Sequence, residues 1–250
     1  MQHFDPAAFT APNAKPLPVI LLLDVSGSMS GAKIQNLNAA VKDMLETFRN
    51  TENGETEIHV AIITFGEEVK LHQPLASASD IALHDLCASG GTPLGTALKM
   101  AKAMIEDKNV VPSRAYRPTV VLVSDGRPGD SWNQPLADFI KDGRSSKCDR
   151  MAMAIGADAD EGVLGKFIEG TKNPLFYAEN ANQLRDVFKF VTMSVTIRSQ
   201  LQNPNVLPDP ISVEIRPATI EERTEKPEKP SAPKRSGDAA SEETSDGGYW

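Results

Sequence analysis

The chain has 250 residues, which is enough to bury a full core in one domain with an appendage. Its formal net charge is -8, so a nucleic-acid partner, whose phosphates repel an acidic surface, is not expected. No apolar run approaches the roughly 20 residues that span a membrane, and the first residues lack the pattern of a secretion signal. We therefore expect a cytoplasmic protein with no membrane partner.

The first strong signal is an apolar run that ends at a carboxylate. Residues 1–16 show no periodicity, and we expect a loose leader there. The run Val19–Leu23 then has no polar alternation, which is typical of a strand covered on both faces in a parallel sheet. Asp24, Ser26 and Ser28 follow, where ligands bind in open α/β sheets. Oxygen donors without His or Cys favour Mg²⁺ or Mn²⁺ over zinc.

The next segments predict a helix and two strands. Apolar residues recur at three- and four-residue steps over Ile34–Phe48, which indicates one face of a helix, with Lys33 on the opposite, polar side. Glu57–Phe65 is largely apolar on both faces and predicts a strand. Val69–His72 is expected to pair back as a short antiparallel edge strand.

A glycine-rich loop, residues 88–95, opens the following helix. Thr92 is placed to cap that helix, with Pro93 at its first position, where the missing N–H does no harm. Another clean strand, Pro118–Ser124, ends at a second carboxylate, Asp125. The alternation of strands and helices then continues to residue 200.

This alternation predicts the fold class of residues 17–200. We expect an α/β domain, doubly wound, with a mostly parallel central sheet, one antiparallel edge strand and helices on both faces. The later elements of this pattern are strands at Met151–Ile155 and Leu175–Ala178 and helices near Leu136–Ile140, Glu161–Glu169 and Leu184–Val195.

Residues 201–250 differ in composition, being rich in Pro and charge, and we expect them to be largely disordered. Ile211–Ile215 is the one stretch there that could add a strand to the sheet edge. The final Tyr249-Trp250 pair is either a chance ending or a docking motif for a partner or a second copy. The two cysteines, Cys87 and Cys148, form no CxxC pair and are expected to be buried, reduced thiols.

Three separated loops carry oxygen donors at one expected edge of the sheet. Two carboxylates and three hydroxyls are too little charge for a closed Ca²⁺ cage, but they suit a Mg²⁺ site that keeps waters and an open position. The alternative is a set of helix caps and turn formers without metal. The five donors are Asp24, Ser26, Ser28, Thr92 and Asp125.

These positions resemble the metal-ion-dependent adhesion site (MIDAS) of the von Willebrand factor A (vWA) family, which is D-x-S-x-S followed by a distant Thr and a distant Asp. The flanking sequences LLLDVSGSMSG, GGTPLGTAL and VLVSDGRPGD are most similar to TerY-like, tellurium-resistance-associated members, which are small stand-alone domains. The resemblance covers about residues 17–198 and implies a vWA, Rossmann-like fold. It also implies that the hydroxyls of Ser26, Ser28 and Thr92 are direct or near-direct ligands.

By the same resemblance, Asp24 and Asp125 would hold bound waters or bind directly, and a partner's Glu or Asp would take the sixth position. A TerY-like member would belong to a bacterial stress, tellurite-resistance or defence system, with a protein kinase or a PP2C-type phosphatase as the partner. The segment after Asp125 is expected to rim the site with Arg127, Asp130 and Trp132. Trp132 is either a partner-binding hot spot or packs on its own domain.

Two alternatives to a metal-dependent binding module stay open. One is a Mg²⁺-dependent phosphohydrolase with Asp24 as the nucleophile, although Ser26 stands where such enzymes carry a second Asp and no convincing Lys is found. The other is a scaffold whose metal only stabilises three loops. We expect a protein that is not an enzyme.

Overall fold

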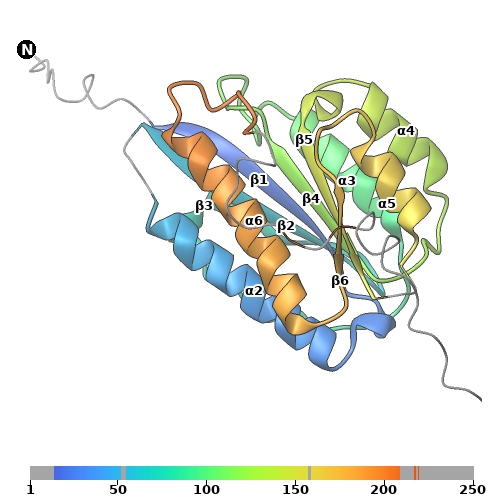
Figure 1. Cartoon of the computed structure of the whole chain (residues 1–250). Coiled ribbons are helices and arrows are strands. Elements are labelled where there is room, and N and C mark those ends of the chain that lie inside the picture. Colours follow the sequence, from blue (N-terminus) through green and yellow to red (C-terminus); the bar gives the residue numbers. More distant parts are fainter. Residues whose placement is uncertain (1–13, 52–54, 157–158, 209–216, 218, 220–250) are drawn as a thin grey trace, which may run out of the picture.

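The computed structural model of the chain describes residues 14–51, 55–156, 159–208, 217 and 219. In this part a six-stranded sheet has the order β3-β2-β1-β4-β5-β6 and carries helices on both faces (Figure 1). The strands are β1 (Lys15–Asp24), β2 (Thr56–Phe65), β3 (Val69–Ser77), β4 (Thr119–Ser124), β5 (Asp149–Ile155) and β6 (Leu175–Ala178). The helices are α2 (Ala32–Arg49), α3 (Leu94–Glu106), α4 (Asn133–Lys141), α5 (Glu161–Ile168) and α6 (Ala181–Gln200), with 3₁₀ turns η1 (Gly27–Met29), η2 (Ala78–Asp80) and η3 (Ser145–Lys147).

The sheet confirms the predicted fold class. Only β3 runs antiparallel, at the edge beside β2, and the other neighbouring strands pair in parallel. β1 and β4 lie side by side in the middle, with Leu23 opposite Val123. The chain leaves β1 toward β2 on one side and returns to β4 on the other. Ligand sites of open α/β sheets lie at such a reversal of strand order.

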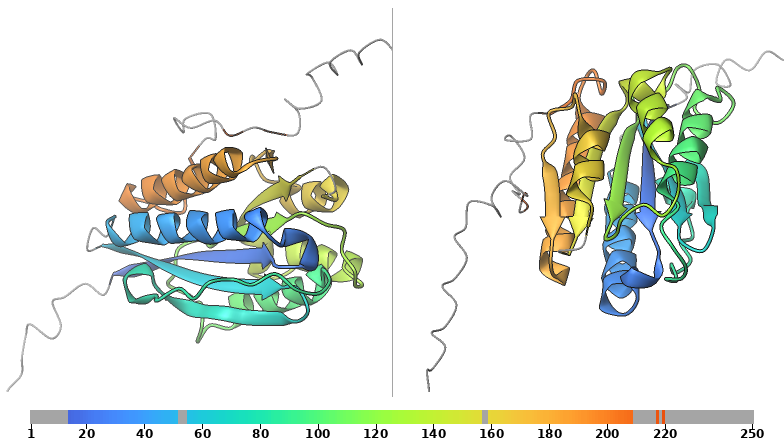
Figure 2. Two further views of the ribbon diagram at one scale, coloured as in Figure 1. Left: turned by 90° about the horizontal axis from the view of Figure 1, so that it is seen from below. Right: turned by 90° about the vertical axis from the view of Figure 1, so that its right-hand side faces the viewer.

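Two hydrophobic cores cover the faces of the sheet. Val19, Leu21 and Leu23 of β1 point into the core shared with α2 and α6, whereas Ile20 and Leu22 point into the core shared with α3, α4 and α5. Figure 2 shows α2 and α6 together on one side of the sheet. Because β1 is buried on both sides, its sequence is a continuous apolar run.

Several element boundaries differ from those predicted. β1 begins at Lys15, two residues inside the expected leader, and β3 extends to Ser77 with register shifts against β2. After the 3₁₀ turn η2, the segment 81–93 has no helix and runs as a loop to the start of α3. Ile211–Ile215 lies outside the described residues, but Thr219 forms an isolated antiparallel bridge with Phe176 of β6.

A buried arginine holds the segment that follows α6. The guanidinium of Arg198, which is 1% exposed, donates to the carbonyls of Pro204 at 2.9 Å and Arg117 at 2.7 Å and to the Thr119 hydroxyl. Burial lowers the pKa of Arg198 to about 10, and the charge of Asp149 acts in the opposite direction. These contacts fix the end of α6 against the amino-terminal edge of the sheet, opposite the edge where Asp24 and Asp125 lie.

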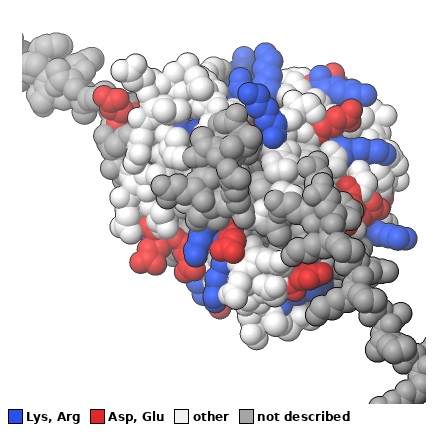
Figure 3. Space-filling view, viewed as in Figure 1, with Lys and Arg blue, Asp and Glu red and all other residues white. Residues whose placement is uncertain are grey.

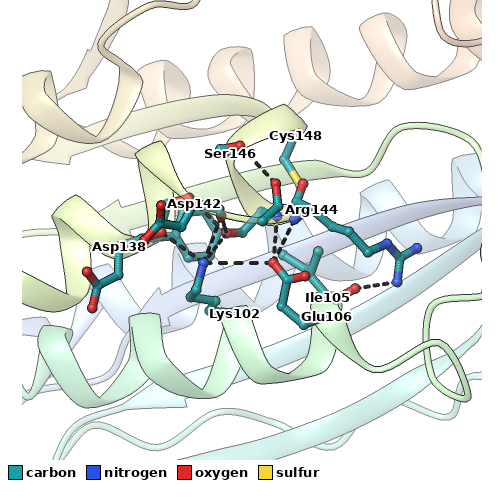
Figure 4. Close-up of polar contacts among 11 residues, drawn as sticks. Lys102, Ile105, Glu106, Asp138, Asp142, Arg144, Ser146 and Cys148 are labelled. Atoms are coloured by element: carbon teal, nitrogen blue, oxygen red, sulfur yellow. Dashed lines mark hydrogen bonds and ion pairs between the residues drawn. The ribbon is translucent and has the colours of Figure 1, made fainter.

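A second polar network joins the end of α3 to the turn after α4 (Figure 4). The Lys102 ammonium donates to the carbonyls of Asp138 and Asp142, and the Glu106 carboxylate accepts the amide N–H of Arg144 at 2.7 Å. Arg144 in turn donates to the carbonyl of Ile105. These contacts satisfy backbone groups at helix ends, so the cluster is explained by packing of α3 against α4.

The remaining features of the described residues are their surface charge, the two cysteines and the character of the helices. On the face shown in Figure 3, acidic and basic side chains of the described residues are interspersed. Both cysteines are free, but Cys87 is exposed, so the prediction that both are buried was wrong for Cys87, which lies in the loop after η2. Burial raises the pKa of the Cys148 thiol to about 12. Among the described helices, none has the length and apolar character needed to cross a membrane.

Candidate metal centre

Asp24 is fixed at the carboxyl end of β1 by two hydrogen bonds. Its Oδ1 accepts the amide N–H of Ser26 at 2.8 Å, and its Oδ2 accepts the Ser124 hydroxyl at 2.6 Å. Asp24 is fully buried, and this burial raises its pKa, although the two serines favour the charged form. The charge of nearby Asp125 raises the pKa of Asp24 further. A buried carboxylate with these neighbours gains from a cation in the site.

The two serines of the first loop connect Asp24 to Asp125. The Ser26 and Ser28 hydroxyl oxygens lie 2.9 Å apart, and the Ser28 hydroxyl donates to Asp125 Oδ1 at 2.6 Å. The 3₁₀ turn η1 produces this arrangement, and its buried Met29 anchors the turn in the core. Carboxylates at the ends of β1 and β4 are thereby joined through the amide N–H of Ser26 and the hydroxyls of Ser26 and Ser28.

The loop that carries Thr92 is held against the first loop by backbone contacts. The amide N–H of Gly27 donates to the Gly90 carbonyl at 2.9 Å. Gly90 has a φ of +73°, and a Cβ there would lie 2.3 Å from the Cα of Glu67, so only glycine fits. A Cβ on Gly126 would lie 3.4 Å from the Thr92 hydroxyl and 3.9 Å from the Ser28 hydroxyl. The hydroxyls of Thr92 and Ser28 therefore both lie beside Gly126, the residue that follows Asp125.

The capping role predicted for Thr92 was wrong. α3 begins at Leu94, after Pro93, and neither its N-cap nor Thr92 supplies the capping side chain. The carboxylate of Asp130 caps α3 instead, because it accepts the amide N–H groups of Gly95 at 2.8 Å and Thr96 at 2.9 Å. The contact of Thr92 with the start of α3 is made by its backbone carbonyl, which accepts the amide N–H of Leu94 at 2.9 Å and also that of Gly129 at 2.8 Å.

The structure adds two residues that the sequence did not single out. Ser124 donates to Asp24, and the Lys33 ammonium lies 2.5 Å from Asp125 Oδ2. Lys33 was placed on the outward side of its helix, but it lies in the first turn and reaches over the end of β4. The serine has a sequence signal, since it precedes Asp125 at a strand end. The reach of Lys33 depends on tertiary structure and has no such signal.

The three expected rim residues lie in different environments. Arg127 is exposed, whereas Asp130 is half-buried and engaged at the start of α3. Trp132 is half-buried, packs against the core under α3, α4 and α5, and has the Lys166 ammonium 5.2 Å from its ring centroid. Arg127 is thus the only one of the three with an exposed side chain.

The donor set suits a hard divalent ion. All five side chains offer oxygen, and the described residues contain no group of three or more His, Cys, Asp or Glu that could hold an ion elsewhere. Two carboxylates and three hydroxyls leave room for water at an octahedral ion such as Mg²⁺. The residues therefore fit the ion that the sequence pattern implies.

Comparison with known proteins identifies relatives of the whole domain. Residues 19–190 match the von Willebrand factor type A domain family. The chain is 26% identical to human inter-alpha-trypsin inhibitor heavy chain H2 over 168 residues, which is 61% of this chain and 17% of the relative. It is 25% identical to Matrilin-3 of Gallus gallus over 182 residues, which is 69% of this chain and 39% of the relative. The chain thus spans less than half the length of both relatives.

Solved structures share the fold. A von Willebrand factor type A protein from Catenulispora acidiphila superimposes with a TM-score of 0.58 at 23% identity, over 72% of this chain and 42% of that one. Proximal thread matrix protein 1 from the mussel byssus, solved with a zinc-occupied MIDAS motif, gives a TM-score of 0.52 at 15% identity, over 72% of this chain and 48% of that one. A divalent ion has therefore been seen in the MIDAS motif of a protein with this fold.

Proposed function

The chain belongs to the von Willebrand factor type A domain family, and from this premise we propose that it is a metal-dependent protein-binding module. A Mg²⁺ or Mn²⁺ ion would be held at the edge formed by β1 and β4, with one position open for a carboxylate of a partner protein. The ligands in this proposal are Asp24, Ser26, Ser28, Thr92 and Asp125.

One observation carries this proposal. Oxygen donors of two loops, about a hundred residues apart in sequence, form one hydrogen-bonded cluster, and the Thr92 hydroxyl of a third loop lies beside it, next to Gly126. Ser28 contacts both Ser26 and Asp125, and its hydroxyl shares the space beside Gly126 with that of Thr92. A set of independent turn formers has no need to converge on one point, whereas ligands of a shared ion must.

The residues have distinct roles in this mechanism. Ser26, Ser28 and Thr92 would bind through neutral hydroxyls, while Asp24 and Asp125 would orient bound waters or bind directly. When bound, an ion ligated mainly by neutral groups keeps most of its positive charge and attracts a carboxylate to its open position. Ser124 positions Asp24 by its hydrogen bond at 2.6 Å. Exposed Arg127 is the rim residue available to contact the partner.

We also propose the cellular setting that the loop sequences favour. The segments around Asp24, Thr92 and Asp125 are most similar to TerY-like proteins, so we place the chain in the cytoplasm of a bacterium, in a tellurite-resistance, stress or defence system. The partner that supplies the Glu or Asp would be a protein kinase or a PP2C-type phosphatase. The sequence resemblance alone supports this part of the proposal.

The geometry favours binding over phosphate-ester hydrolysis. A nucleophilic carboxylate must reach the substrate, but Asp24 is fully buried and both of its oxygens accept hydrogen bonds. Hydrolysis of a generic phosphate ester with Mg²⁺ that disappears in Asp24→Asn would overturn this view. Partner binding that survives chelation would instead favour a scaffold whose metal only stabilises the loops.

The proposal is tested by calorimetric titration of the purified protein with Mn²⁺, followed by pull-down from the host with and without EDTA. Thr92→Ala should weaken Mn²⁺ binding and abolish capture of the partner. The matched control is Thr96→Ala, because the Thr96 hydroxyl bonds only to Asp130 in the described structure. Equal Mn²⁺ affinity in Thr92→Ala and in the wild type would refute the proposed site.

A further inference from the structure

Lys33 makes an ion pair inside the cluster of proposed ligands. Its ammonium lies 2.5 Å from Asp125 Oδ2, while the other oxygen of Asp125 accepts the Ser28 hydroxyl. The Asp125 side chain is fully buried, whereas that of Lys33 is 38% exposed. A Cβ on Gly156, just after β5, would lie 3.8 Å from the same ammonium. The positive charge thus lies over the carboxyl ends of β4 and β5.

The position of Lys33 is unfavourable for its own helix. Lys33 is the second residue of α2, and the first turn of this helix holds no acidic residue. A cation near a helix N-terminus is disfavoured by the helix dipole. The compensating interaction is the buried carboxylate of Asp125. A cation is needed there because Asp24 and Asp125, two buried carboxylates, meet in one cluster and repel each other.

We propose that Lys33 is a built-in counterion that competes with the divalent ion for Asp125. In the metal-free protein the ammonium satisfies the carboxylate and keeps the ligand cluster assembled. When a divalent ion binds, the ammonium leaves Asp125 and turns toward solvent, which its long flexible stem and partial exposure permit. Lys33 therefore stabilises the metal-free domain and lowers its affinity for metal. This inference rests on the proposed metal site.

The test compares Lys33→Met with Lys42→Met, using Mn²⁺ alone as the probe. Lys42 is a matched control because it lies on the same helix and pairs with Asp85 at 2.5 Å, with both side chains at least half exposed and outside the cluster. The readouts are the Mn²⁺ dissociation constant from calorimetry and the thermal unfolding midpoint in EDTA. Lys33→Arg, which keeps the positive charge, separates loss of charge from loss of packing.

We expect Lys33→Met to bind Mn²⁺ about fivefold more tightly than the wild type, since removing a partly exposed ion pair changes an equilibrium by about that factor. Its unfolding midpoint in EDTA should fall by about 2–4 °C. Lys42→Met and Lys33→Arg should not gain Mn²⁺ affinity. If the wild type binds Mn²⁺ and Lys33→Met binds it equally or more weakly, this inference is overturned, while the proposed metal site stands. Absence of Mn²⁺ binding in both proteins overturns the proposed site as well.

Discussion

Asp130 offers a quantitative test of how the site loops are held, because it caps α3 from another part of the chain. Its Oδ1 accepts the N–H of Gly95 at 2.8 Å, and its Oδ2 accepts the N–H of Thr96 at 2.9 Å and the hydroxyl of Thr96 at 3.0 Å. One capping side chain contributes about 1 kcal/mol, and a negative charge near a helix N-terminus adds about 0.5 kcal/mol. Since Asp130 binds two amides and one hydroxyl, Asp130→Ala should lower the free energy of unfolding by about 2 kcal/mol.

The assay is denaturation in guanidinium chloride followed by circular dichroism, with EDTA present so that metal does not contribute. Asp130→Asn keeps one acceptor oxygen but loses the charge, and should lower the free energy of unfolding by about 1 kcal/mol. The control is Ser131→Ala, an exposed neighbour, which should change it by less than about 0.5 kcal/mol. An effect of Asp130→Ala no larger than that of Ser131→Ala would refute the capping argument.

Native protein at pH 8 should react with a thiol reagent at exposed Cys87 only, because Cys148 is buried and this burial raises its pKa to about 12. Labelling of Cys148 in the native protein would contradict this prediction. The native state then holds the Cys148 proton more tightly than the unfolded chain, whose thiol titrates near 9.0, so stability should fall as pH rises from 9.0 to about 12. Cys148→Ala should flatten that slope in denaturation curves at several pH values. Gly90→Ala should destabilise more than Gly170→Ala, whose cost is about 1–2 kcal/mol. Both glycines have positive φ, but of the two only Gly90 would bring a Cβ against another backbone, that of Glu67. Denaturation curves that show the same decrease in the free energy of unfolding for both variants would contradict this close approach.

The fold was predictable because the strands that define it are buried on both faces. Every residue of β4 is buried, and β1 is buried from Pro16 onward, so both appear in the sequence as largely apolar runs. Edge strand β3 was predicted to end at His72, but it continues to Ser77, because most of its residues are at least partly exposed and the sequence there forms no apolar run. The ends of β1 and β4 mark Asp24 and Asp125 directly, because polar residues stop each run.

The contacts that organise the site could not be read from the sequence. Asp130 caps a helix that begins 36 residues earlier, and Lys33 reaches a carboxylate 92 residues away. Both contacts depend on which loops meet at the sheet edge and on side-chain reach. Thr92 and Pro93 carried a local capping signal, but the loop conformation gives that role to Asp130 instead. Local preference was overridden here by tertiary structure.

The central claim is that side chains from three loops share one divalent ion. The most direct measurement is a crystal structure of the protein grown with Mn²⁺, in which anomalous scattering locates the metal. We predict one peak among the hydroxyls of Ser26, Ser28 and Thr92, with Asp24 and Asp125 next to it and one coordination position facing solvent. A protein saturated with Mn²⁺ whose peak lies elsewhere, or is not in contact with Thr92, would contradict the claim.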